Sequence, residues 1–445
     1  MTNTPPARSA ATQTSAQDPA SPPPARRRRR RWPWIVACCV AGFLWLLEDP
    51  ATLRVSSPVS AADSDFPDYV ASLLGAAVTA GDTFDVLQNG DEIFPAMLEA
   101  IGAAQRRISF ESFIWSDGEV SRQFTDAFVA AARRGVDVRI VLDGYGARDL
   151  PRAAVKRLED AGARLVWFNQ LRTFTVDRVN YRTHRKVLVV DGQVAFTGGV
   201  GLADHWLGHA QSPDHWRDTQ VRVRGPAVRA LEASFYENWI ESGGAEAPRL
   251  DPEPPEHAAA TPDARTVVAW SNFSGGASNV KLLYLLSIAA ARRSVDIQSP
   301  YVVIDASIRW SIAEARKRGV RVRILTDGEN TDAMPVKWAS RAGYHELLQQ
   351  GVIVAEYQPT MMHVKALVVD DVWSIAGTAN FDNRSLELND ELVVAAQDAD
   401  LAATLVAAFD RDLSQSLVLS PDTWAARPLW HRPLERFWSL FGELF

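Results

Sequence analysis

Cysteine is almost absent from the 445 residues of this chain. The only two, Cys38 and Cys39, are adjacent and lie in an apolar stretch at residues 32–47. The rest of the chain therefore has no disulfide and no thiol redox chemistry, and it relies on packing for its stability. A glycine-rich phosphate loop is also missing, because Gly144-Tyr145-Gly146 is too short for a nucleotide fingerprint. No cofactor is expected.

Positive charge is scarce outside the N-terminus. The net charge is -7, and residues 1–31 contribute +6 from seven arginines and Asp18, which leaves -13 for the remainder. A nucleic-acid channel is normally basic, so no nucleic-acid partner is expected. His205, His209 and His215 lie close together in the sequence, but their segment lacks the glutamate of a zinc-protease pattern. No metal site is expected.

The chain does contain one short pattern twice, with the spacing H-x-K-x4-D-x6-G-[GT], at residues 184–199 and 363–378. The matching positions are His184, Lys186, Asp191 and Gly199 in the first copy and His363, Lys365, Asp370 and Thr378 in the second. Only the second copy adds Asn380. Residues 131–140 also recur as residues 314–324 with one extra residue, so the chain is an internal duplication.

Each copy of the pattern predicts a strand and a turn. Residues 187–190 and 366–369 are short apolar runs typical of buried strands, and Asp191-Gly192 favours a tight hairpin. Because side chains alternate along a strand, a histidine and a lysine two residues apart share one face. We expect Asp191 and Asp370 to cap the hairpin or pair with a lysine, although they complete the motif.

Two such motifs in one chain resemble the phospholipase D superfamily. Other segments resemble its bacterial cardiolipin synthase branch, and the match runs from about residue 84 to about residue 433. These segments are residues 180–186, 198–204, 216–218, 298–301, 344–348 and 381–385. The resemblance implies an α/β fold of two phospholipase D-like α/β/α sandwich lobes, related by a pseudo-twofold axis, with the active site at the lobe interface. Many members carry Asn where this chain has Gly201, which we interpret as a subfamily variant that leaves Asn380 as the only amide.

The chemistry that needs two such motifs is phosphodiester exchange. Lys186 and Lys365 would hold the negatively charged phosphate. One histidine attacks phosphorus and forms a phosphohistidine, while the other protonates the leaving alcohol and deprotonates the incoming one. The resemblance implies that His184 is the nucleophile and His363 the general acid and base; from the sequence alone the reverse assignment stays open.

The resemblance also implies supporting residues. Asp218 and Glu391 each follow a motif at a comparable interval and resemble the family's orienting carboxylates. Asn380, Thr378 and Gly199 are expected to bind phosphate. Glu111 and Gln298 occupy similar places in the two repeats, and no role is assigned to them.

The domain organisation follows from composition and repeats. Residues 66–246 form the predicted first lobe, residues 247–264 a Pro- and Ala-rich linker, and residues 265–425 the second lobe. Residues 426–445 carry apolar residues at helical spacing, which predicts an amphipathic helix. This helix would lie either at a lipid interface or against the protein core.

The N-terminus predicts a membrane anchor. Residues 1–31 are a Pro- and Ser-rich tail that ends in the arginine run at residues 26–31. The apolar stretch at residues 32–47 is shorter than the ~20 residues that span a bilayer comfortably, though its flanks can extend it. Arginines mark the cytoplasmic side, so we expect an uncleaved anchor in the bacterial inner membrane, with periplasmic lobes. The alternative is a signal peptide cleaved after Val59-Ser60-Ala61.

These observations predict a membrane-bound cardiolipin synthase. It would transfer a phosphatidyl group between two phosphatidylglycerol molecules and release glycerol; phosphatidylethanolamine remains open as a substrate. The main alternative is a hydrolytic phospholipase D, in which water replaces the lipid alcohol. The net charge disfavours a nuclease, and a non-enzymatic membrane scaffold would require a broken motif.

Overall fold

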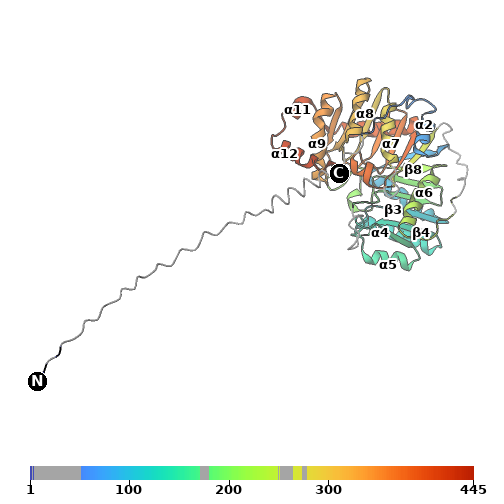
Figure 1. The fold of residues 1–445 in the computed structure, drawn as a ribbon. Helices are drawn as coiled ribbons and strands as arrows, with labels where there is room; N and C mark the ends of the chain where they lie inside the picture. The colour runs from blue at the N-terminus through green and yellow to red at the C-terminus, as the bar shows by residue number, and fades with distance from the viewer. Residues whose placement is uncertain (3, 5–51, 171–179, 249, 251–263, 273–277) are drawn as a thin grey trace. The chain divides into compact units, whose positions relative to one another are not determined.

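Two β-sheets flanked by helices form the part of the chain from Thr52 to Phe445 (Figure 1). The computed structural model describes residues 1–2, 4, 52–170, 180–248, 250, 264–272 and 278–445. The expected tail and anchor at residues 5–47 and most of the expected linker lie outside these residues. Among the helices that are described, none is long and apolar enough to cross a membrane.

The first lobe contains a mixed seven-stranded sheet in the order β2-β8-β7-β6-β3-β4-β5. Its strands are β2 (Thr83–Gln88), β3 (Arg107–Ser112), β4 (Asp137–Asp143), β5 (Arg164–Phe168), β6 (Val187–Val190), β7 (Val194–Gly198) and β8 (Thr219–Arg224). Its helices are α3 (Asn89–Ala103), α4 (Glu119–Arg133), α5 (Arg152–Asp160), the 3-10 turn η2 (Asp204–Trp206) and α6 (Val228–Glu241). Strands β3, β4 and β5 are parallel, and the other pairs are antiparallel.

The second lobe contains a nine-stranded sheet in the order β1-β9-β15-β14-β13-β10-β11-β12-β16. Its strands are β1 (Val78–Ala80), β9 (Arg265–Trp270), β10 (Ser294–Gln298), β11 (Arg321–Asp327), β12 (Ile353–Tyr357), β13 (Ala366–Val369), β14 (Trp373–Gly377), β15 (Leu392–Gln397) and β16 (Ser416–Leu419). Its helices are α2 (Phe66–Leu74), α7 (Asn279–Ala290), α8 (Ala306–Lys317), α9 (Met334–Gln349), the π-turn η3 (Arg384–Leu388), α10 (Ala399–Leu413), α11 (Pro421–Ala425), α12 (His431–Ser439) and the 3-10 turn η4 (Gly442–Leu444).

The two sheets repeat one topology. From β9 to β12 the second sheet has the same strand order as the first has from β2 to β5, and the same pairs are parallel. β1 and β16 are additions at its two edges. The predicted duplication and the predicted α/β fold of two similar lobes are therefore confirmed.

The predicted start of the first lobe at residue 66 is wrong. Helix α2 packs on α7, and β1 pairs with β9, so both elements belong to the second lobe (Figure 1). The buried side chains Phe66 and Val70 join the core of that lobe. The chain crosses to the first sheet at β2, where Thr83 pairs with Arg224. The cause is tertiary: an apolar helix face at residues 66–74 does not indicate which sheet it will cover.

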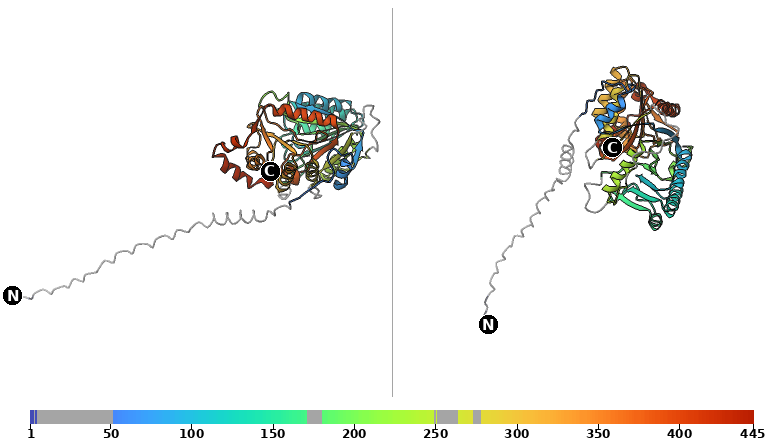
Figure 2. Two further views of the ribbon diagram at one scale, coloured as in Figure 1. Left: turned by 90° about the horizontal axis from the view of Figure 1, so that it is seen from above. Right: turned by 90° about the vertical axis from the view of Figure 1, so that its right-hand side faces the viewer.

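The inner faces of the two sheets share one apolar cluster. Val221 of β8, Val268 of β9 and Val394 of β15 belong to it, together with residues of α6. Helix α10 covers the second sheet and also contacts β2 of the first. Figure 2 shows the two lobes side by side from two further sides, the first in cyan to green and the second in yellow to red with the blue α2 and β1. Burial of this apolar surface holds the lobes together, so residues from both can form one rigid site.

Candidate active site

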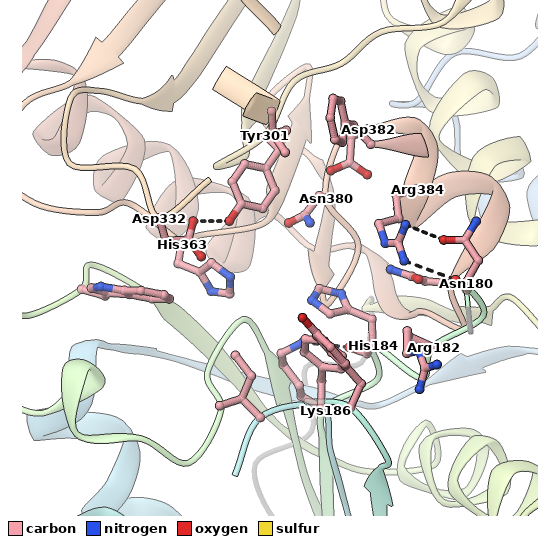
Figure 3. Close-up of a pocket in the computed structure, with 17 residues that line it drawn as sticks. Asn180, Arg182, His184, Lys186, Tyr301, Asp332, His363, Asn380, Asp382 and Arg384 are labelled. Carbon is pink, nitrogen blue, oxygen red and sulfur yellow. Dashed lines mark hydrogen bonds between the residues drawn. The ribbon is translucent and has the colours of Figure 1, made fainter. Parts of the chain in front are cut away.

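A cavity of about 430 Å³ opens where the segments before β6 and β13 meet (Figure 3). His184 and Lys186 line it from the first lobe, and His363 and Asn380 line it from the second. The two imidazoles face the same space in Figure 3. The two copies of the motif therefore form one site.

Backbone hydrogen bonds between the lobes fix both histidines. The His184 N–H donates to the Asp390 carbonyl (2.9 Å), and the His363 N–H donates to the Arg217 carbonyl (2.7 Å). The residues that follow these two carbonyls are Glu391 and Asp218, the two predicted orienting carboxylates. Each lobe thus presents its carboxylate to the histidine of the other.

Each histidine is paired with the carboxylate of the other repeat. His184 Nδ1 lies 2.8 Å from Glu391 Oε1, and His363 Nδ1 lies 2.9 Å from Asp218 Oδ2. An ionised carboxylate on Nδ1 favours the tautomer with a proton on Nδ1 and a free lone pair on Nε2. Nε2 is therefore the ring nitrogen that remains for chemistry.

Thr378 and Gly199 support the carboxylates and do not line the cavity. The Thr378 hydroxyl donates to Glu391, and it also accepts from the Leu392 N–H at 3.0 Å. At the matching position, a Cβ on Gly199 would lie 2.3 Å from Asp218 Oδ1, so only glycine leaves room for this carboxylate. Each of them contacts a carboxylate beneath a histidine, and their expected binding of phosphate stays a prediction.

The glycine at position 201 also has a steric cause. A Cβ there would lie 2.9 Å from Ile114 Cβ and 3.1 Å from the Trp206 ring. Trp206 is fully buried and donates its indole N–H to Asp218 (2.9 Å), so an asparagine at position 201 would displace a support of the site. The amide of Asn380 lines the cavity and makes no hydrogen bond to the described residues.

Asp191 and Asp370 lie at the far ends of β6 and β13 from the histidines. The Asp191 carboxylate accepts backbone N–H groups of residues 105–107 at 2.7–2.9 Å, and Asp370 accepts those of residues 292–294. Both have positive φ (56° and 55°), as the predicted tight turn requires. Both aspartates complete the catalytic motif, yet their partners are backbone amides at the start of β3 and β10, where we expected a lysine or the hairpin itself.

Glu111 and Gln298 support residues next to the site through hydrogen bonds. Glu111 is fully buried and accepts from the Thr183 hydroxyl, next to His184. Gln298 donates to Asp412 (2.7 Å), which also accepts from Arg217, next to Asp218. The two residues occupy equivalent positions in β3 and β10, but the segments that they support differ.

Burial governs the charges of the site. It lowers the pKa of His184 to about 4, despite the opposing charge of Glu391, and it lowers the pKa of His363 well below the ordinary value. Burial also lowers the pKa of Lys186 to about 7 and that of Lys365 to about 8, and the charge of Lys365 lowers the pKa of Lys186 further. A bound phosphodiester would bring negative charge and restore protonation of the lysines and of one histidine.

The pH dependence of kcat/KM should be bell-shaped. Burial raises the pKa of Asp218 to about 6, so acid protonates this carboxylate and removes the charge that holds His363. On the alkaline side, Lys186 and Lys365 lose their protons near their pKa values of about 7 and about 8, which weakens phosphate binding. Activity should therefore fall below about pH 6 and above about pH 8. Lys186→Arg should move the alkaline limb upward, and a profile that stays flat across both limbs would contradict this account.

Several lining residues were not predicted as site residues. Arg182, Asn180 and Arg384 lie on one side of the cavity, and Tyr301 and Asp332 lie on the other (Figure 3). All except Asp332 belong to segments that carry the family resemblance. These segments could have indicated the residues, but the resemblance implied no role for them.

An aromatic cluster packs around His363. The ring centroids of Trp206 and Trp216 lie 5.5 and 5.4 Å from that of His363. His205 stacks on both tryptophans, whereas His209 contacts Asp91 and His215 contacts Ser212. No group of three metal-binding side chains occurs among the residues with described positions.

The predicted C-terminal helix docks on the protein. Helix α12 packs along α9, and the backbone N–H of Arg384 donates to the Phe445 carbonyl (2.8 Å). Phe445 itself lines the cavity. Helix α12 therefore lies against α9 with an outer face exposed at Trp430 and Phe437, and the choice between a lipid interface and the protein core stays a prediction.

Known proteins are similar to this chain in sequence and in fold. The family model described as "Cardiolipin synthase, PLD-like domain" matches residues 97–239 and 284–413. Cardiolipin synthase 2 of Bacillus cereus is 34% identical over 367 residues, which cover 80% of this chain and 70% of the relative. The major cardiolipin synthase of Bacillus subtilis is 31% identical over 371 residues, with 83% and 77% covered.

Among solved structures, the phosphatidylserine synthase of Haemophilus influenzae is similar with a TM-score of 0.63. The match covers 84% of this chain and 97% of that chain, at 14% sequence identity. At this identity the likeness concerns the fold alone, and it agrees with the arrangement of two similar lobes.

Proposed function

Because this chain belongs to the cardiolipin synthase family of the phospholipase D superfamily, we propose that it transfers a phosphatidyl group from one phosphatidylglycerol to another. The products are cardiolipin and glycerol. One observation carries the proposal: the histidines of both motifs line a single cavity together with Lys186, and each histidine has a carboxylate on Nδ1. This arrangement suits a nucleophile and a general acid acting on one phosphorus atom.

The mechanism has two displacements. His184 Nε2 attacks phosphorus, and the bond from phosphorus to the oxygen of the headgroup glycerol breaks. Protonated His363 gives its proton to the departing glycerol. His363 then takes the proton from a hydroxyl of the second phosphatidylglycerol, whose oxygen attacks phosphorus as the bond to His184 breaks. Lys186, Lys365 and Asn380 hold the phosphate oxygens through both steps. The contact with Glu391 supports the assignment of His184 as nucleophile. Burial raises the pKa of the Glu391 carboxyl, but the charge of His184 and its hydrogen bond outweigh burial and lower this pKa, so the carboxylate beside His184 stays ionised.

Product analysis tests the proposal. Purified full-length protein is incubated with phosphatidylglycerol vesicles, and lipids are identified by mass spectrometry. Cardiolipin and glycerol in equal amounts are expected, and phosphatidic acid alone would instead establish a hydrolase. Phosphatidylethanolamine vesicles, alone and mixed with phosphatidylglycerol, test whether the second headgroup is used.

We also propose that the protein acts at a lipid surface, with the outer face of the C-terminal segment against the bilayer. Leu429, Trp430, Phe437 and Leu440 have exposed fractions of 74, 60, 50 and 58%. This apolar patch belongs to the same part of the lobe as the site, because α12 packs on α9, whose Val336 lines the cavity. The acyl chains of two phospholipids cannot fit in about 430 Å³, so they must remain in the membrane beside the cavity. The aromatic and aliphatic side chains of the patch suit a position at the membrane interface.

A double variant tests this patch. Trp430→Ser with Phe437→Ser should reduce activity on phosphatidylglycerol vesicles by about tenfold or more, since each side chain contributes roughly 1.5–3 kcal/mol when buried in lipid. Activity on monomeric short-chain phosphatidylglycerol should be unchanged. Ile240→Ser, which alters an equally exposed side chain on α6, is the matched control and should affect neither substrate. An equal loss on both substrates would show that the patch has no role at the bilayer.

For location, we propose a single-pass anchor at residues 32–47, with the N-terminus cytoplasmic and the lobes periplasmic. The arginine run at residues 26–31 supports this orientation. A reporter enzyme that is active only in the periplasm, fused after Phe445, should show activity. Activity of a reporter that works only in the cytoplasm would reverse the assignment.

A further inference from the structure

The cavity is lined by two further cations besides Lys186. Arg182 comes from the first lobe and Arg384 from the second, and both line the cavity beside Asn180 (Figure 3). Arg384 Nη1 donates to Asn180 Oδ1 (2.9 Å) and to the Leu444 carbonyl (3.0 Å), and its Nη2 donates to the Asn180 carbonyl (3.3 Å). All three acceptors are neutral.

These contacts hold the Arg384 guanidinium in place without neutralising it. Within the described part of the chain, no carboxylate forms an ion pair with Arg384. Arg182 Nη1 donates to the Asn169 carbonyl (3.0 Å) and lies 3.6 Å from Asp143. Burial lowers the pKa of Arg384, the charge of Asp382 opposes this shift, and the charge of Arg182 adds to it, so the two guanidinium groups repel each other. An anion between them would remove this repulsion, and the planar guanidinium fork matches phosphate oxygens.

The proposed reaction requires a second anion in the same cavity. The reacting phosphate lies between the histidines, whereas the acceptor phosphatidylglycerol has its own phosphodiester, separated from the attacking hydroxyl by the glycerol carbons. We propose that Arg384 and Arg182 bind this non-reacting phosphodiester of the acceptor lipid. The inference rests on the proposed function and deepens it: the two arginines favour an acceptor that carries a phosphodiester over water or a simple alcohol.

Two water-soluble acceptors test the inference. Glycerophosphoglycerol, the deacylated form of phosphatidylglycerol, carries the phosphodiester, and isotopically labelled glycerol does not. Both are offered at equal concentration to the full-length protein with phosphatidylglycerol vesicles, and each transfer product is measured by mass spectrometry, together with phosphatidic acid from hydrolysis. The wild-type protein should prefer glycerophosphoglycerol by about tenfold or more.

The variants separate acceptor selection from catalysis. Arg384→Gln and Arg182→Gln should each remove most of the preference while hydrolysis persists, and Arg384→Lys should retain part of it. Arg157→Gln, which alters a surface arginine paired with Asp126, is the matched control and should keep the full preference. Thermal unfolding of each variant checks its folding.

The outcomes distinguish the two proposals. If the wild-type protein forms no cardiolipin and no other transfer product, the proposed function fails, whether or not phosphatidic acid is released. If it transfers to both acceptors equally, or if the variants keep the preference, the anion site is wrong and the function stands. A parallel loss of hydrolysis and transfer in the variants would also overturn the inference, because acceptor selection would then not be their role.

Discussion

With a phosphatidyl ester of p-nitrophenol as donor, His363→Ala should release one equivalent of nitrophenol per enzyme in a burst and then stall. Nitrophenolate departs without protonation, so the first displacement does not need a general acid. The second displacement needs His363 to deprotonate the acceptor, and its loss should slow turnover by about 10²–10⁴-fold. The stalled enzyme should carry an acid-labile phosphatidyl group on His184.

His184→Ala should behave differently on the same donor. Without a nucleophile no covalent intermediate forms, and we expect no burst and a loss of turnover on the order of 10⁴-fold or more. His345→Ala is the matched control, because this exposed histidine on α9 contacts only Gln349 among the described side chains and should leave the kinetics unchanged. A burst in His184→Ala and none in His363→Ala would reverse the two roles.

The duplicated motif was sufficient to predict the fold class and the strands next to the site. The apolar runs at residues 187–190 and 366–369 form β6 and β13 as expected, and the Asp191-Gly192 turn has the predicted positive φ values. These features are local, since they depend on side-chain periodicity and turn chemistry. The sequence also predicts that both motifs meet in one cavity, because both histidines have to reach the same phosphorus atom.

The pairing of histidines and carboxylates could not be predicted in this way. Asp218 follows the first motif along the chain, yet it contacts His363 of the second. This exchange depends on how the lobes dock, through the shared apolar cluster and the hydrogen bond from His363 N–H to the Arg217 carbonyl. The contacts of Gly199 and Thr378 with these carboxylates could not be predicted for the same reason, because motif spacing does not reveal which atoms a residue contacts in the folded protein.

Glu391→Gln should reduce kcat by about 10²–10⁴-fold with little change in stability. The carboxylate accepts the Nδ1 proton of His184, and a glutamine amide can donate to Nδ1 instead. His184 would then carry its proton on Nε2, where the lone pair must attack phosphorus. The burst of nitrophenol from the activated donor should slow in proportion, since the lost step is the first displacement.

Asp218→Asn should produce the complementary result. It removes the carboxylate on His363 Nδ1, so the burst from the activated donor should persist while turnover and the acid limb of the pH profile are lost. Glu232→Gln is the matched control for a buried carboxylate, because Glu232 pairs with Arg107 on α6 and β3, away from the cavity. It should lower the unfolding temperature and leave kcat near the wild-type value. If Glu391→Gln lowers stability as much as Glu232→Gln and leaves kcat unchanged, the carboxylate is a structural support and does not set the tautomer of His184.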